Sequence, residues 1–335
     1  MAIQISKRLK IVFIIFAGVI LAGFTYVYQK IIGGKVINLP ENKFLIGEKN
    51  TITTTPQKET QEIVAIAYSE NIAKGIGEVV QKTGNLDFIK PGQKVLIKPN
   101  VNSNDPAPGT THPEALAEMV RLVKAKGAYV IVGDRSNPQY KTLTAMKATG
   151  MYDAAKGAGA DEIVGFEDEE WIRVTPENAK NWPNGFRIPK RLQEIDHIIS
   201  LPVLHTHSIT SHSLAIKNLV GLINPTDRIL FHASAKREEM IAEISLAIKP
   251  SLTVIDGTRA FIEGGPSDGK VAETKVYLAS KDVLTADVLG VSLLKKNNAI
   301  LRYEDPWKSP QINHFLNLGL SQYSSDEINK GILKI

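Results

Sequence analysis

Two histidines and a lysine follow a strongly apolar segment near the middle of the chain. Residues 197–204 are typical of a buried strand, which is followed by His205 and His207. A helix expected over residues 211–222 then carries Lys217 and Asn218. Surface loops seldom concentrate such groups directly after a core strand. The segment therefore predicts a site in which the two imidazoles and Lys217 are catalytic and Asn218 holds substrate.

The spacing of His205 and His207 also suits a metal ion. Alternate side chains of a strand point the same way, so both imidazoles would reach one cation or one anion. The further expected ligands are His232, Asp134 and Asp256, a set that suits zinc, manganese, iron or nickel. The alternative is that the histidines form hydrogen bonds with backbone carbonyls. An isolated His-x-His pattern is only a weak indication of a metal site. A divalent metal is thus one hypothesis for an otherwise unknown cofactor.

Lys217 has two interpretations. In the first, it pairs with a substrate carboxylate or phosphate, or acts as a base with a lowered pKa. In the second, it lies on the solvent face of its helix. Apolar neighbours such as Ile216, Leu219 and Val220 leave that face narrow.

Polar residues also follow the other apolar runs. In open parallel sheets, ligands bind beyond the carboxyl ends of the strands. We therefore expect the groups at these ends to share one rim, and they are Lys98, Asn100, Asp134, His205, His207 and Asp256. Lys98 and Asn100 are the expected substrate-binding members.

Gly264 and Gly265 open a glycine-rich loop. Glycines allow backbone amides to turn toward an anion, so both residues are candidates for substrate binding. A plain turn before the next strand is the alternative. The loop matches neither a P-loop nor the dinucleotide G-x-G-x-x-G pattern, and no G-x-S-x-G elbow surrounds the serines near the histidines.

The elements that position these groups alternate between strand-like and helix-like patterns. This alternation predicts an α/β domain with a largely parallel, Rossmann-like sheet flanked by helices. Strands are expected at 63–67, 94–98, 129–132, 161–166, 171–174, 197–204, 251–255 and 275–279. Helices are expected at 72–82, 113–126, 211–222, 237–248 and 285–294.

The amino terminus predicts a single transmembrane helix. Residues 11–28 carry no charge and would span about 27 Å as a helix, close to the hydrocarbon thickness of a bilayer. Basic residues precede this run, which favours a cytoplasmic amino terminus and an extracytoplasmic body. A cleaved signal peptide is the alternative. We expect an anchor over residues 1–30, a polar linker over 31–62 and the α/β domain over 63–335.

Composition excludes several classes of function. The chain has no cysteine, so it can form no disulfide, no cysteine nucleophile and no iron–sulfur cluster on its own thiolates. A net charge of +5 without a long basic run argues against nucleic-acid binding and is compatible with a small anionic ligand. The sequence does not identify a protein partner.

Several spaced motifs together resemble one family, the domain of unknown function 362 (DUF 362), over about residues 63–295. The motifs lie at 98–100, 111–113, 133–134, 201–207, 216–222, 232, 249–250, 254–257, 263–269 and 286–290. The resemblance implies an α/β domain, sometimes found in iron–sulfur proteins with ferredoxin-like cysteine motifs. This chain would be a cluster-free member. It also lacks the lysines that the family tends to show where Pro202–His207 stands here.

The resemblance brings no established reaction. Our first hypothesis is therefore a membrane-anchored enzyme acting on a small anionic substrate, with or without a divalent metal. The alternatives are a non-catalytic protein that binds an anion or metal, or an accessory subunit of an iron–sulfur redox complex.

Overall fold

The computed structural model describes residues 36–39 and 64–332. The expected anchor over residues 1–30 lies outside them. Within the described part of the chain, no helix has both the length and the apolar character needed to cross a bilayer. Four residues of the expected linker form strand β1 (Val36–Leu39), which pairs with β6 (Trp171–Pro176).

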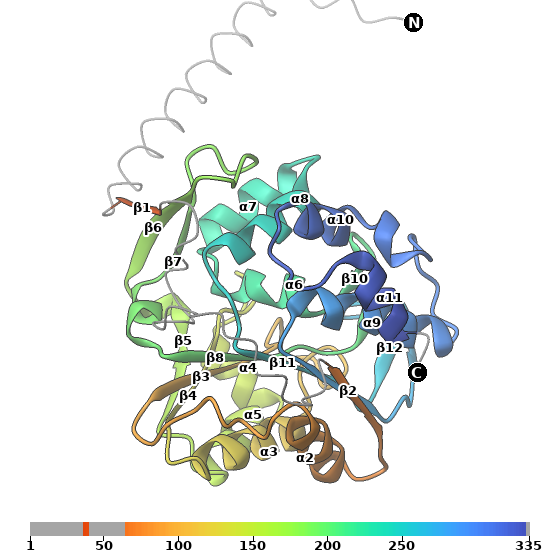
Figure 1. The fold of residues 1–335 in the computed structure, drawn as a ribbon. Helices are drawn as coiled ribbons and strands as arrows, with labels where there is room; N and C mark the ends of the chain where they lie inside the picture. The colour runs from red at the N-terminus through yellow and green to blue at the C-terminus, as the bar shows by residue number, and fades with distance from the viewer. Residues whose placement is uncertain (1–35, 40–63, 333–335) are drawn as a thin grey trace, which may run out of the picture.

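A seven-stranded sheet runs through the centre of the domain (Figure 1). Only β14 is antiparallel to its neighbours, so the other six strands run in one direction. The prediction of a largely parallel sheet is thereby confirmed. The strands in spatial order are β2 (Val64–Tyr68), β14 (Val276–Ser280), β11 (Leu252–Gly257), β8 (His197–Leu201), β3 (Lys94–Pro99), β4 (Tyr129–Asp134) and β5 (Glu162–Gly165).

Helices cover both faces of this sheet because its strands are apolar on both sides. In β3, Val95 and Ile97 pack in one hydrophobic core while Leu96 packs in the other. Successive side chains of a strand point to opposite faces, so a continuous apolar run fills two cores. One core is closed by α2 (Ile72–Lys82), α3 (Pro113–Lys124), α4 (Thr142–Ala148) and α5 (Met151–Gly157), and the other by α6 (Ala215–Asn218), α8 (Arg237–Glu243), α9 (Val283–Lys296), α10 (Pro310–Asn317) and α11 (Ser325–Ile332).

The chain reverses its course across the sheet between β3 and β8. It passes from β3 to β4 and β5 on one side, then returns to β8 on the other side of β3, where Pro99 pairs with Leu201. Crossovers that leave adjacent strands in opposite directions open a crevice at the strands' carboxyl ends. The topology therefore places a crevice beyond Pro99 and Leu201.

Two expected elements differ from the structure. Strand β6 lies in a separate sheet with β1 and β7 (Phe186–Pro189), because its ladder partners are those strands. The helix expected over residues 211–222 starts later. Residues Ser211–Ser213 form β10, which pairs with β9 (His205–His207).

The buried Asp287 Oδ1 accepts the backbone N–H of Ile216 at 3.2 Å, and this contact fixes where α6 begins. One helical turn follows, continued by the 3₁₀ turn η3 (Leu219–Leu222). The structure adds elements that we did not predict, namely α7 (Pro225–Ala233), β12 (Ala260–Gly264) and β13 (Gly269–Ala272), together with α10 and α11.

Candidate functional site

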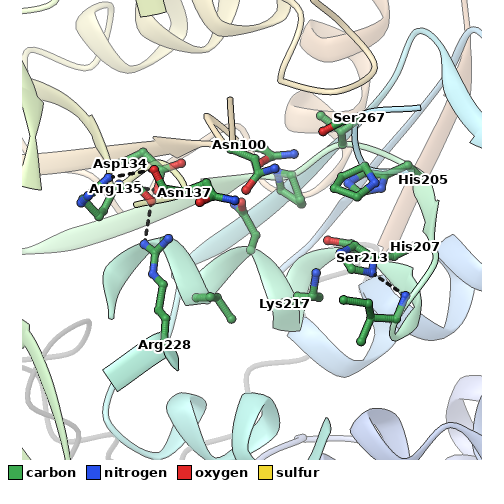
Figure 2. A pocket seen from close by; sticks show the side chains of 18 of the residues that line it. Asn100, Asp134, Arg135, Asn137, His205, His207, Ser213, Lys217, Arg228 and Ser267 are labelled. Atoms are coloured by element: carbon green, nitrogen blue, oxygen red, sulfur yellow. Dashed lines mark hydrogen bonds between the residues drawn. The ribbon is translucent and has the colours of Figure 1, made fainter. Parts of the chain in front are cut away.

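A cavity of about 590 Å³ opens in the crevice at the carboxyl ends of β3, β4 and β8. Figure 2 shows imidazoles and Lys217 toward one end of it and Asp134 and Arg228 toward the other. Eight of the eleven predicted site residues line it, namely Lys98, Asn100, Asp134, His205, His207, Lys217, Asn218 and His232. Segments far apart in the chain thus contribute to one cavity.

Lys98 and Asp134 form a buried ion pair in the cavity wall. Lys98 Nζ lies 2.7 Å from Asp134 Oδ1 and donates to the Pro99 carbonyl at 3.0 Å. Asp134 Oδ2 accepts the backbone N–H of Val101 at 2.8 Å, and Oδ1 accepts that of Arg135 at 2.8 Å. Burial lowers the pKa of Lys98, although Asp134 opposes this shift. Because the Lys98 ammonium and the Asp134 carboxylate are both bound to protein groups, we assign the ion pair a role in positioning the cavity wall.

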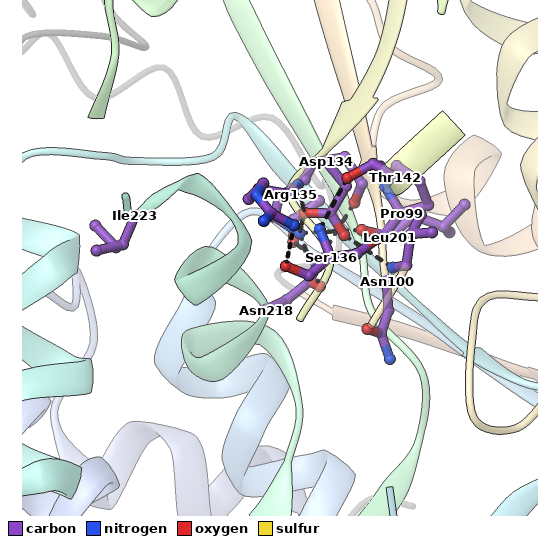
Figure 3. Close-up of polar contacts among 12 residues, drawn as sticks. Pro99, Asn100, Asp134, Arg135, Ser136, Thr142, Leu201, Asn218 and Ile223 are labelled. Carbon is purple, nitrogen blue, oxygen red and sulfur yellow. Dashed lines mark hydrogen bonds and ion pairs between the residues drawn. The ribbon is translucent and has the colours of Figure 1, made fainter. Parts of the chain in front are cut away.

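Asn218 connects this ion pair to α6. Its Oδ1 accepts from Lys98 Nζ at 3.2 Å, and its Nδ2 donates to the Lys98 carbonyl at 3.2 Å and to Ser200 Oγ at 2.9 Å. Figure 3 shows Asn218 near the end of β4, where Asp134 lies. Asn218 therefore fixes α6 on the sheet, and its expected role in holding substrate stays a prediction.

His205 is buried and carries its proton on Nδ1. That nitrogen lies 2.8 Å from the Thr206 carbonyl, which can only accept a hydrogen bond. The Nε2 lone pair is then free, and no residue of the described chain bonds it. Burial lowers the pKa of His205 to about 4, so the ring is neutral near pH 7.

His207 has the opposite tautomer. Its Nδ1 accepts the backbone N–H of Ile209 at 3.1 Å, which leaves the proton on Nε2. Burial lowers its pKa strongly, and the charge of Lys217 lowers it further. The two rings lie 6.5 Å apart between centroids. The cavity is thus lined by one imidazole that accepts hydrogen bonds and one that donates them.

Lys217 is half-buried, and its side chain lines the cavity. Burial lowers its pKa to about 7; Glu238 raises the pKa while Arg228 lowers it. No hydrogen bond or ion pair within the described chain reaches its ammonium group. This lysine is therefore available to a ligand or a proton.

Two arginines that we did not predict, Arg135 and Arg228, line the other end of the cavity. Arg228 donates to the carbonyls of Ile223 and Ser136 at 3.0 Å each and to that of Arg135 at 2.6 Å. Within the described residues no carboxylate forms an ion pair with it, and burial lowers its pKa to about 10. Arg135 lies next to Asp134 at a strand end, so the strand-end rule would have found it. Arg228 belongs to an unpredicted helix and carries no such signal.

Three predicted residues do not line the cavity. Asp256 Oδ2 accepts the His112 N–H at 2.8 Å, and its Oδ1 accepts from Thr258 Oγ1 at 2.6 Å. Gly264 and Gly265 have φ near +76° and +75° and form the turn of the β12–β13 hairpin. A β-carbon on Gly265 would lie 2.4 Å from the Thr206 carbonyl, so this glycine serves close packing on β9.

The predicted metal ligands are spread out. Within residues 36–39 and 64–332, no three His, Asp or Glu side chains gather as a metal site would require. Asp134 is engaged by Lys98, and His232 is exposed. The His207 lone pair accepts a backbone N–H, so His205 Nε2 is the ring nitrogen of the histidine pair whose lone pair could bind a metal.

Comparison with known proteins assigns the chain to a family. Residues 95–292, more than half of the chain, match the family described as domain of unknown function (DUF362), and the chain belongs to it. The resemblance that the spaced motifs indicated is confirmed. The chain is also 28% identical over 223 residues to the thylakoid-associated protein sll1697 of Synechocystis, and the match covers 64% of this chain and 67% of that protein.

Proposed function

We propose that this protein is an enzyme that transfers a proton on a small anionic substrate held in the cavity. The observation that carries the proposal is the position of Lys217. Its amine lines the cavity beside two neutral imidazoles, without a partner in the described chain, and its pKa is lowered to about 7. An acid/base group works best when its pKa lies near the working pH.

The charges around the cavity favour an anion. Lys98 is neutralised by Asp134 at 2.7 Å, whereas Arg228 and Lys217 form no ion pair with a carboxylate of the described chain. The hydrogen bonds of the buried Arg228 go to neutral carbonyls, so a bound anion would supply the charge partner that this guanidinium lacks. The amides of Asn100 and Asn137, which also line the cavity, supply neutral hydrogen-bonding groups.

In the proposed reaction one proton leaves the substrate and returns to it. Neutral Lys217 takes a proton from a substrate carbon next to a carboxylate and becomes an ammonium. The electron pair left behind delocalises onto a carboxylate oxygen, to which His207 Nε2–H donates. His205 Nε2 accepts a hydrogen bond from a substrate hydroxyl or water. Lys217 then returns the proton, so no oxidant or reductant is consumed.

The test is proton exchange in D₂O. The full-length protein is incubated with a panel of small carboxylic acids, with and without a phosphate group, and loss of carbon-bound protons is followed by NMR. We expect exchange with at least one acid, its loss in Lys217→Met, and retained anion binding without exchange in Lys217→Arg, because arginine stays protonated. Lys141→Met is the matched control, since Lys141 is 71% exposed.

Two outcomes would contradict this function. Tight binding of an acid without exchange would favour the non-catalytic binding protein. Full exchange in Lys217→Met would remove the lysine from the reaction. A divalent metal on His205 remains a separate proposal, and elemental analysis of wild type and His205→Ala checks it, since equal near-zero contents would exclude it.

We also propose that the domain works at a membrane and outside the cytoplasm. The apolar run over residues 11–28 and the name of the thylakoid-associated relative support this location. An accessory role beside an iron–sulfur partner stays the third candidate, and co-purification with a cysteine-rich protein would favour it.

A further inference from the structure

Two exposed isoleucines stand at the mouth of the cavity. Ile229 is 64% exposed and Ile209 is 38% exposed, and both line the cavity that also holds Lys217 and Arg228. They come from different elements, Ile229 from α7 and Ile209 from the loop between β9 and β10. Ligand pockets are lined largely by apolar side chains, so these two residues are placed to contact a bound ligand.

The backbone holds Ile209 in this exposed position. Its N–H donates to His207 Nδ1 at 3.1 Å, and its carbonyl accepts from Arg302 at 2.9 Å. Arg302 also donates to the Ser208 carbonyl at 3.1 Å. The loop that sets the tautomer of His207 therefore also fixes an apolar side chain beside it.

Helix α7 divides its side chains between the cavity and the rim. Arg228 and Phe231 are buried, whereas Ile229 and His232 are exposed and also line the cavity. Residues three apart in a helix are neighbours on its surface, so Ile229 and His232 share one side. The Phe231 and His232 rings lie 4.2 Å apart. The helix thus offers a cation inward and apolar surface at the mouth.

We propose that the substrate is amphiphilic, with its anionic group held inside the cavity at Lys217 and an alkyl chain that leaves past Ile209 and Ile229. This inference rests on the proposed function and names its substrate class. A polar cavity would bind the anionic head but leave the chain in water. Apolar side chains at the rim remove part of that chain from water as it binds. Such molecules are concentrated at the membrane where we place the domain.

The test measures binding of methyl, butyl and hexyl phosphate and of the matching carboxylates to the full-length protein by calorimetry. These chains are short enough to stay in water. Each covered methylene can add up to about fourfold in affinity. We expect the longest member of each series to bind about tenfold more tightly than the shortest member. The expected gain is no larger because the rim covers only part of the alkyl chain.

The variants assign that gain to the rim. In Ile209→Asn/Ile229→Asn, the gain with chain length should disappear while affinity for the shortest anion stays within about twofold. Ile300→Asn is the control, because Ile300 is 66% exposed and does not line the cavity. It should keep the full gain.

Several outcomes overturn the inference. Equal affinity for all chain lengths would contradict it. An increase in affinity with chain length that persists in the double variant would contradict it as well. If the shortest anions bind through Lys217 while chain length has no effect, the proposed function stands without the amphiphilic substrate. If no anion of either series binds, the proposed function and the amphiphilic substrate are both contradicted.

Discussion

Gly221 packs directly against Asp134. A β-carbon at this glycine would lie 1.9 Å from Asp134 Oδ1 and 2.4 Å from Lys98 Nζ. The 3₁₀ turn after α6 can therefore approach the buried ion pair this closely only because residue 221 is a glycine. This approach sets the position of the segment that carries Lys217.

Gly221→Ala should destabilise the protein by about 1–3 kcal/mol, because a methyl group there must displace a buried and fully hydrogen-bonded pair. It should also weaken anion binding by moving α6. Gly77→Ala is the matched control. Gly77 lies in α2 with open space around its Cα, so that substitution should be neutral or stabilise by about 0.5–1 kcal/mol. Urea unfolding of both variants checks the contrast, and equal stabilities would contradict it.

Asp134→Asn should cost about 3–5 kcal/mol, because it leaves the Lys98 ammonium buried without its charge partner. Asp87→Asn removes a carboxylate that is 67% exposed from its pair with Lys126 and should cost about 1 kcal/mol or less. Chemical denaturation compares the two. A loss at Asp134 as small as that at Asp87 would show that the buried pair does not hold the cavity wall.

Acid should destabilise the fold through His205. The pKa of this ring is about 4 in the folded protein and near 6.5 when exposed. The unfolded chain therefore binds more protons between these values, and stability falls as the pH drops through that window. The loss due to His205 is on the order of 3 kcal/mol. Thermal unfolding at pH 7 and pH 4 should show a smaller loss in His205→Gln, and parallel curves would refute this assignment.

Glu238→Gln should lower the pKa of Lys217 further. The Glu238 carboxylate raises that pKa, and burial in turn raises the pKa of Glu238 to about 7. The variant should therefore shift the acid limb of the exchange profile down by roughly a few tenths of a pH unit. Glu239→Gln, on the same helix but paired with Lys236 at 2.9 Å, should leave the profile in place. A shift of equal size in both would mean that Glu238 does not act through Lys217.

A carboxyl-terminal reporter that is active only outside the cytoplasm should be active when fused to the full-length chain. The basic residues before the apolar run favour this orientation. Activity of the fusion should be lost when residues 11–28 are deleted. An inactive full-length fusion that is stably produced would place the domain in the cytoplasm.

The fold could be predicted in outline because each strand of a covered sheet must be apolar on both faces, as Val95, Leu96 and Ile97 are. The same reasoning placed Lys98, Asp134 and His205 at one rim. It failed at residues 211–213, where pairing with β9 outweighs a helical pattern. Tertiary contacts decide such short segments because local preferences there are small.

The amino-acid pattern alone therefore sufficed to predict the sheet, the family of the protein and the approximate location of the site. It could not separate Asp134, which lines the cavity, from Asp256, which binds the His112 N–H outside it. Nor could it reveal the tautomers of His205 and His207 or the isolation of Lys217. Those properties arise from burial and from partners distant in the chain, and only the packed structure brings such partners within hydrogen-bonding distance.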